Sequence, residues 1–320
     1  MNKKLAIIGV DTSNYTTSIA LVDLEGKVIA NLKRLLPVKQ GEVGLRQSDA
    51  VFSHVKNLPE LMTQLQDYMK DYRLVSVGVS EKPRNVEGSY MPCFLSGVAV
   101  AQAISTTVSV PLYKFSHQCG HIMAALYSSG MKNLCLDRDF AAFHVSGGTT
   151  EMLKVRQCDN GFSIDQVGGT KDLNAGQVID RVGVYLGLGF PAGKELEALA
   201  LKYQGKIPKR KVIEQEGYIN LSGLENIAKK LYDEEKDREK VAAFVLDYLA
   251  RAIEAMSRSY INKYGDSPIV YAGGVMSNSL IKSYLEPRFD AHFAEPALSC
   301  DNAVGIAFLA RDKYLKLQVI

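Results

Sequence analysis

The first 116 residues alternate between short apolar runs and one stretch of helical periodicity. Three apolar runs, separated by small polar turns, predict strands at residues 5–11, 18–24 and 28–34. The apolar residues of 51–68 recur at helical spacing and predict a helix. A buried strand, a second helix and a short strand are then expected at 73–80, 94–105 and 110–116. Strands that alternate with helices in this way indicate an α/β fold.

The second half of the chain repeats this opening. Residues 139–169 again predict a strand, a glycine- and threonine-rich turn, a strand, a polar turn and a strand, with a helix from Ala175 to Leu186. The polar, lysine-rich region 203–240 predicts a solvated helical insert. The alternative for this region is a basic patch that faces RNA, carried by Lys206, Lys209, Arg210 and Lys211.

The last third of the chain predicts a long helix, a core strand and two closing helices. These are expected at about 239–264, at 267–275, and from about Asn278 and Asp301 onward. The repeated strand–turn–strand units predict two related lobes. A length of 320 residues, 47% of them hydrophobic, is also typical of two lobes or domains.

Composition narrows the class of protein. Apolar runs are too short to span a membrane, and the first of them is cut by Asp11, so we interpret it as a strand rather than a signal peptide. Five scattered cysteines without CxxC spacing favour reduced thiols in a cytosol. The formal net charge of +3 is compatible with RNA or phosphate partners without indicating them.

Turns of small residues follow three of the apolar strands. They lie at 11–17, 146–150 and 273–278, and the last two contain Gly-Gly pairs that let a backbone approach a phosphate or sugar. Tight strand ends also need glycine, so one such turn alone means little. None of the three fits a Walker P-loop or a GxGxxG turn. A nucleotide held by backbone amides is therefore expected, and a P-loop kinase or dinucleotide dehydrogenase is not.

Two histidines and several aspartates are candidates for chemistry. His117 and His121 are four residues apart, which places both on one helix face and suits joint ligation of a metal. Satisfied core histidines are the alternative, and the absence of a glutamate after His117 argues against a zinc protease. Asp301 is a candidate third ligand or a helix N-cap. Asp180 is a candidate ribose ligand or an ion-pair partner of Arg181.

Six motifs, in order along the chain, jointly resemble one family. They are GVDTS, SHQCGH, VSGGTTEM, GGTKDLNAGQVIDRVGVYLGLGFPAG, YAGGVMSNSLI and CDNAVGIA. The family is that of the catalytic subunit of threonylcarbamoyladenosine synthase, formerly labelled a glycoprotease. The resemblance covers nearly the whole chain.

The resemblance implies a two-lobed, actin-like or Hsp70-like ATPase fold with duplicated lobes. The first lobe would be residues 1–115, completed by a C-terminal helix at 301–320, and the second would be 116–300 with the insert at 203–240. A divalent metal, zinc or iron, would be bound by His117, His121 and Asp301. Asp11 would be the catalytic carboxylate. ATP, AMP or an acyl-adenylate would be held by Ser146, Gly147, Gly148, Asp172, Gly176, Asp180, Gly273, Gly274 and Asn278.

The implied reaction moves a threonylcarbamoyl group from threonylcarbamoyl-AMP to an adenosine in tRNA. A metal can polarise the carbamoyl carbonyl, and AMP is already a good leaving group. The implied partners are an adenine nucleotide, tRNA, an inactive related subunit that forms a dimer, and a small ATPase. The implied location is the cytoplasm, without contact to a membrane.

The chain departs from the family at positions close to the phosphates or the transferred group. Tyr15 and Thr16 stand where the family has an acidic pair, Thr149 where it has a histidine, and Leu173 where it has a second carboxylate. The family's Gly/Pro-rich loop is SEKPRNVEGSYMP here. These changes indicate a divergent paralogue. The alternatives are a carbamoyltransferase acting on a small molecule and a non-catalytic nucleotide-binding scaffold.

Overall fold

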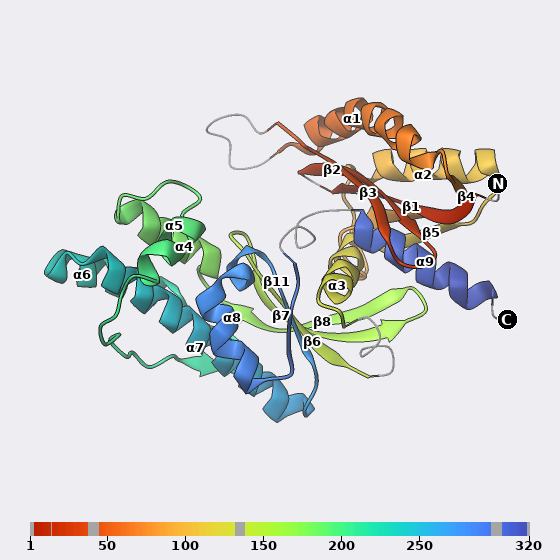
Figure 1. Ribbon diagram of the computed structural model, residues 1–320. Coiled ribbons are helices and arrows are strands. Elements are labelled where there is room, and N and C mark those ends of the chain that lie inside the picture. The colour runs from red at the N-terminus through yellow and green to blue at the C-terminus, as the bar shows by residue number, and fades with distance from the viewer. Residues whose placement is uncertain (1–2, 14, 38–44, 132–137, 296–302, 319–320) are drawn as a thin grey trace. The chain divides into compact units, whose positions relative to one another are not determined.

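The chain forms two compact units, each built on one mixed β-sheet (Figure 1). The computed structural model describes residues 3–13, 15–37, 45–131, 138–295 and 303–318. The first unit comprises residues 1–127, 158–163 and 300–320, and the second comprises 128–157 and 164–299. Within the described ranges, no helix combines the length and apolarity that crossing a membrane would require.

The sheet of the first unit has five strands in the order β3-β2-β1-β4-β5. Three consecutive strands form an antiparallel meander, and two parallel strands extend it on the other side of β1. Their bounds are β1 Lys4–Ser13, β2 Thr16–Asp23, β3 Val28–Leu35, β4 Tyr72–Lys82 and β5 Leu112–Ser116. All five follow the predicted positions.

Helices cover both faces of this sheet. Ala6, Ile8 and Val10 face a core shared with α1 (Gln47–Met69) and α2 (Phe94–Val108). Gly9, one position out of phase, faces α9 (Val304–Gln318), where a Cβ would overlap the helix backbone. Successive residues of β1 point to opposite faces of the sheet, and helices cover both faces, so β1 is buried on both sides.

The first unit extends beyond the predicted boundary at residue 115. Helix α3 (His117–Ser128) belongs to it up to Tyr127, because the α3 and α9 backbones touch at Gly120 and Gly305, where neither glycine leaves room for a side chain. The hairpin tip at 158–163 also belongs to it, since Gly161 lies against Cys119. Contacts between residues far apart in sequence thus determine the boundary between the two units, and the local hydrophobic pattern cannot predict such contacts.

The sheet of the second unit has the order β12-β11-β6-β7-β8-β10-β9. Its central strands β6, β7 and β8 are the predicted repeat of the opening meander, and β11 runs parallel to β6. The bounds are β6 Phe140–Val145, β7 Thr150–Cys158, β8 Gly161–Thr170, β9 Glu214–Gln215, β10 Tyr218–Ile219, β11 Ile269–Ala272 and β12 Ala291–Phe293.

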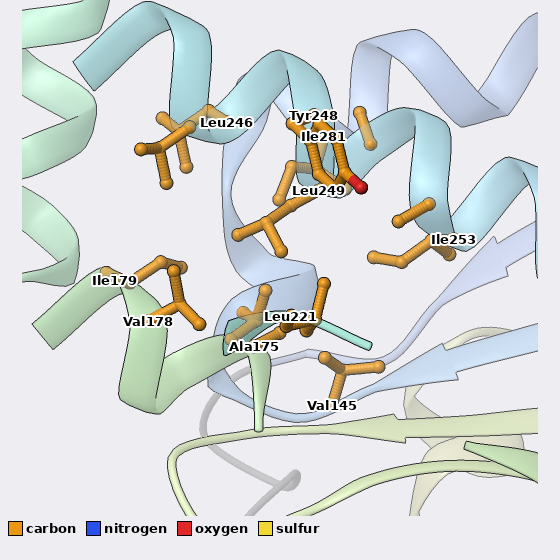
Figure 2. Packing of buried hydrophobic residues seen from close by; sticks show 14 of the residues in the cluster. Val145, Ala175, Val178, Ile179, Leu221, Leu246, Tyr248, Leu249, Ile253 and Ile281 are labelled. Atoms are coloured by element: carbon orange, nitrogen blue, oxygen red, sulfur yellow. The ribbon is translucent and has the colours of Figure 1, made fainter. Parts of the chain in front are cut away.

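The core of the second unit lies between this sheet and its helices (Figure 2). The long helix α7 contributes Leu246, Leu249 and Ile253, which pack with Val178 of α4 and Val145 of β6. The helices are α4 Ala175–Tyr185, α5 Gly193–Ala200, α6 Ser222–Glu235, α7 Arg238–Tyr264 and α8 Ser279–Leu285, with short 3-10 turns at Gly274–Ser277 and Glu286–Arg288.

The region predicted as a solvated insert is integrated into the second unit. Besides α6, it contributes the short strands β9 and β10, and β10 pairs in parallel with β8. Ile219 and Leu221 are buried and anchor this segment to the core. Lys209 of the basic run is paired with Asp247 of α7 at 2.6 Å, so this lysine has an intramolecular partner.

Candidate functional site

His117 and His121 meet on one face of α3, as their spacing predicts. Their Nε2 atoms are 2.8 Å apart, and the two rings meet edge to face. Both side chains are partly buried at the start of the helix. Strand β5 ends at Ser116, and α3 begins with the next residue, His117. The local fold therefore brings two imidazole nitrogens to one point.

A buried carboxylate orients this pair. Asp11, on β1, lies 3.0 Å from Nδ1 of His117 through its Oδ2, and the hydroxyl of Ser80 donates to its other oxygen. An ionised carboxylate only accepts, so we assign the Nδ1–H tautomer to His117, which leaves its Nε2 as an acceptor. Asp11 therefore acts through His117 and is a positioning residue in this geometry.

This donor set fits a divalent metal. Imidazole nitrogens are borderline-soft ligands that suit zinc and iron, and a carboxylate on the far ring nitrogen is the usual partner of a ligating histidine. Among the described residues, no group of three or more histidine, cysteine or carboxylate side chains surrounds one point. Asp301, the predicted third ligand, lies outside the described residues.

A second polar network lies beside Asp11. His54 of α1 is fully buried and shares a hydrogen bond of 2.9 Å between its Nδ1 and Thr17, whose hydroxyl also accepts from Asn57. Burial lowers the pKa of His54 from 6.5 to about 4, although the charge of Asp11 opposes this shift. His54 is therefore neutral in the folded protein near pH 7.

The second unit contains a cavity of about 440 Å³ at the carboxyl ends of β6 and β11. Side chains and backbone from the 146–150 turn, α4, the 190–197 segment and the 274–278 turn surround it. The lining residues are Gly147, Gly176, Ile179, Asp180, Pro191, Gly193, Lys194, Glu197, Gly274, Val275, Ser277 and Asn278. The edge where parallel strands end is a common place for nucleotides in α/β proteins.

Five of the nine predicted nucleotide residues line this cavity. They are Gly147, Gly176, Asp180, Gly274 and Asn278. Asp180 accepts a hydrogen bond of 2.8 Å from the amide of Ala192, which fixes the turn before α5. Asn278 is buried and caps α8 by accepting from two amides at 3.1 Å. These two polar side chains are held in place by backbone hydrogen bonds.

The other four predicted residues do not line the cavity. Ser146 and Gly148 lie in the same turn as Gly147, and Gly273 directly precedes Gly274 and packs against the backbone of Val145. Asp172 accepts from the amides of Leu221 and Ser222 at the start of α6. Burial alone would raise the pKa of Asp172, but these amides and the Ser222 hydroxyl lower it to about 2. Its carboxylate is therefore used to cap α6.

Gly176, which lines the cavity, and Gly273, which precedes the lining residue Gly274, are required by close backbone contacts. A Cβ on Gly176 would lie 2.6 Å from the backbone of Gly147, so the first turn of α4 packs directly on the 146–150 turn. Gly273 has φ of +103°, and a Cβ there would overlap the carbonyl of Val145. The glycines therefore let neighbouring backbone segments lie in direct contact beside the cavity.

Sequence reasoning missed Lys194 and Glu197. Lys194 lines the cavity at the start of α5, and Glu197 accepts from the amide and hydroxyl of Ser279. Both look like ordinary solvated helix positions in the sequence. Only the proline and glycine of FPAG, directly before α5, are typical of a turn with a defined shape.

The departures from the family pattern occupy different surroundings. Thr16 is buried in β2, whereas Tyr15 is exposed at the β1–β2 turn. Leu173 packs against the core of the second unit, and Thr149 accepts from the amide of Ser146 within its turn. The lost carboxylate at Leu173 is thus replaced by a packing contact.

Comparison with known sequences gives one consistent family. The family profile described as "tRNA N6-adenosine threonylcarbamoyltransferase" matches residues 44–308. A protein of that name from Neorickettsia sennetsu is 27% identical, covering 98% of this chain and 94% of its own. One from Thermus thermophilus is 30% identical, covering 95% of this chain and 91% of its own.

Comparison with solved structures identifies the fold. Full-length HypF in its phosphate- and nucleotide-bound form has a TM-score of 0.60 at 12% identity, over 99% of this chain and 56% of HypF. A glucokinase of the ROK family from Streptomyces griseus has a TM-score of 0.52 at 13% identity, over 96% of this chain and 99% of its own. These relatives share the actin-like ATPase fold, so the predicted fold class is confirmed.

Proposed function

The chain belongs to the tRNA N6-adenosine threonylcarbamoyltransferase family, and from this premise we propose that it transfers a threonylcarbamoyl group from threonylcarbamoyl-AMP to an adenosine of tRNA. The observation that carries the proposal is the convergence of the His117 and His121 Nε2 atoms behind a buried, hydrogen-bonded Asp11. A merely structural histidine pair does not need a carboxylate partner of this kind.

In the first unit, His117 and His121 would hold zinc or iron, with Asp301 as a further ligand. The metal would supply a Lewis acid for the carbamoyl carbonyl. Asp11 keeps the Nδ1–H tautomer of His117 and thereby presents the Nε2 lone pair. Each imidazole would ligate through its Nε2 lone pair, so the hydrogen bond between the two Nε2 atoms must break and its proton must move to Nδ1 of the donor ring.

In the second unit, the cavity at the ends of β6 and β11 would bind the adenylate. The amides of the 146–150 turn suit an anion, since glycines lie there without covering side chains. Asp180 would accept from ribose hydroxyls with the oxygen that the Ala192 amide leaves available. Lys194 adds a positive charge for the phosphate.

The resemblance also supports a related dimerising subunit, a small ATPase and a cytoplasmic location. Phe52 and Val55 on α1 are one helical turn apart and expose 72% and 58% of their surfaces, and Leu95 is exposed on the neighbouring α2. An exposed apolar stripe of this kind suits a partner subunit. Co-purification of wild type with the related subunit, lost in a Phe52→Glu/Val55→Glu variant, would test this.

A carbamoyltransferase with a small-molecule acceptor is the second candidate. The loss of the acidic pair at Tyr15 and Thr16 favours it, because both positions border the turn that follows Asp11. A scaffold without catalysis would not need the Asp11–His117 hydrogen bond. The tRNA transferase requires both the metal and tRNA, the small-molecule carbamoyltransferase requires the metal alone, and the scaffold requires neither.

The first test compares wild type with a His117→Ala/His121→Ala variant, both purified without chelator. Metal content by mass spectrometry and AMP affinity by calorimetry are measured on each. Transfer is measured as threonylcarbamoyladenosine released from tRNA after supply of threonylcarbamoyl-AMP. We expect about one metal per chain in wild type, none in the variant, and transfer in wild type alone.

A His292→Ala variant is the matched control, because His292 lies on β12 outside the pair. It should retain both metal and transfer. A wild type that binds metal and AMP but modifies only a small acceptor would favour the second candidate. A wild type that binds AMP yet cannot be loaded with any metal would overturn the transferase proposal.

A further inference from the structure

A second, larger cavity lies entirely within the first unit. Its volume is about 630 Å³, and it opens between the β4–β5 edge of the sheet and the hairpin tip at 158–163. The lining residues are Glu81, Lys82, Asn85, Leu112, Tyr113, Lys114, Phe115, Cys158, Asn160, Phe162, Ser163 and Lys313. None of the roles proposed above uses this cavity.

Three lysines give the cavity a positive charge. Lys82, Lys114 and Lys313 come from β4, β5 and α9, and none of them forms an ion pair with a carboxylate among the described residues. Glu81 is the one acidic residue of the lining. Lys313 is held at 3.1 Å from the Asn160 side chain and lies over the Tyr113 ring. Three lysines from separate elements, which line one cavity with a single carboxylate, favour an anionic ligand.

Strands β4 and β5 contribute residues both to this cavity and to the surroundings of the histidine pair. Lys82 is the register partner of Ser116, which directly precedes His117. Ser80, which donates to Asp11, lies two residues before Lys82 on β4. The loop after β4 is fixed at this edge, because Asn85 donates to the carbonyl of Phe162 at 3.1 Å. An anion in the cavity would therefore lie beside the proposed transfer site.

The lining distinguishes this cavity from the nucleotide cavity of the second unit. Four glycines line the nucleotide cavity and expose backbone amides to a compact phosphate. The lysine cavity has no glycine in its lining, and its charges are on long, flexible side chains. Point charges spread along a groove suit successive phosphates of a chain better than one enclosed phosphate.

We propose that the Lys82–Lys114–Lys313 cavity binds the phosphodiester backbone of RNA and guides an adenosine toward the histidine pair. The proposal rests on the proposed function, because tRNA is the acceptor there. The cavity would add affinity without reading sequence, since lysine contacts to phosphate carry no base information. It would position the acceptor while the metal and adenylate sites carry the chemistry.

The test is tRNA binding by a Lys82→Glu/Lys114→Glu/Lys313→Glu variant, measured by fluorescence anisotropy across a range of salt concentrations. A Lys→Gln triple variant keeps the aliphatic stems and guards against misfolding. We expect tRNA affinity to fall by about tenfold or more, and the slope of log affinity against log salt to decrease by about 2 to 3. AMP affinity should stay at the wild-type value.

The matched control is Lys4→Glu/Lys27→Glu/Lys56→Glu. These three exposed lysines of the same unit also form no ion pair among the described residues, and the net charge changes equally. Unchanged tRNA binding in this control supports a specific site. Equal loss in both variants, or loss in neither, overturns the proposal.

Two further outcomes separate this inference from the proposed function. If wild type binds tRNA through the three lysines but transfers nothing to it, the transfer reaction fails and the RNA site stands. If wild type modifies tRNA and the glutamate variant does so with unchanged KM, the reaction stands and the RNA site fails. If inorganic phosphate at low millimolar concentration displaces tRNA completely, the cavity is a small-phosphate site and the inference is overturned.

Discussion

The histidine cluster of the first unit and the cavity of the second unit are built by opposite means. The cluster depends on the identity of a few side chains, since Asp11, His117 and His121 form one chain of hydrogen bonds. The cavity depends on absent side chains, since Gly176 and Gly273 allow backbones to touch. Substitutions should therefore damage the first region through chemistry and the second through shape.

Because the two regions are built differently, substitutions in them should have different effects on protein stability and on ligand binding. Asp11 and His54 are buried polar side chains, each held by hydrogen bonds to other side chains. The glycine turns have no titratable group of their own to change, and an added methyl group must displace backbone.

The largest effect is expected for Gly273→Ala. The residue has φ of +103°, and its new methyl group would overlap the carbonyl of Val145. Strained backbone and overpacking together should lower the free energy of unfolding by about 3 kcal/mol. Urea unfolding measures this loss, and calorimetry should find AMP binding abolished.

Gly274→Ala is the neighbouring control. Nothing lies within 4 Å of a Cβ there, although Gly274 lines the cavity. Its stability should change by less than about 0.5 kcal/mol. Equal destabilisation by both alanines would show that the 273–278 turn is generally sensitive, and would remove the argument from shape.

The next effect concerns His54 and pH. The pKa of the unfolded imidazole is 6.5 and that of the folded one is about 4, because burial disfavours the charged form. The unfolded chain therefore binds a proton first as the pH falls. The contribution of neutral His54 to the free energy of unfolding is thus fully present above pH 6.5 and is lost as the pH falls toward 4. Between pH 7 and 4.5 wild type should lose about 2 to 3 kcal/mol from this group.

A His54→Asn variant isolates this contribution. Other groups also titrate in this range, but they cancel when the variant and wild type are compared at each pH. Urea unfolding at pH 7 and pH 4.5 should show a smaller loss of stability in the variant. Parallel curves for the two proteins would mean that His54 is not the source of the pH dependence.

The third effect tests Asp11 as the residue that orients His117. Asp11→Asn can still accept from Ser80, but its amide would donate to Nδ1 of His117 and force the proton onto Nε2. A protonated Nε2 cannot ligate, so metal affinity should fall by about 10- to 100-fold. Competition with a metal-binding dye measures the loss.

Asp23→Asn is the matched control for this change. Asp23 is also a buried carboxylate of the first unit, and it accepts from the amide of Lys27 at 2.8 Å without contacting a histidine. Its metal affinity should equal that of wild type. If Asp11→Asn also retains full affinity, the carboxylate does not set the tautomer of His117.

The order of elements was predictable because local pattern determines it. Strands β1 to β8 and helices α1, α2 and α4 follow the periods that the sequence shows, within a few residues. The boundary after residue 115 was not predictable, because the Gly120–Gly305 contact joins residues 185 positions apart. Strands β9 and β10 are two residues each, too short for any pattern.

The candidate site was predictable where spacing alone brings residues together. His117 and His121 meet because a helix repeats every 3.6 residues. The contact between Asp11 and His117 spans 106 positions, so no local signal contains it. Lys194 was missed because a lysine that lines a cavity and one that faces solvent look alike in a helix.

The smallest effect separates two roles of Asp172, which the motif resemblance implies to be a nucleotide ligand. In the structure its carboxylate accepts from the amides of Leu221 and Ser222, two donors that the start of α6 leaves without helical partners. Asp172→Ala should therefore lower the free energy of unfolding by about 1 kcal/mol. AMP affinity should stay unchanged, whereas Asp180→Ala, inside the cavity, should weaken it. A loss of AMP affinity in Asp172→Ala that matches the loss in Asp180→Ala would mean that the cap also contacts the nucleotide.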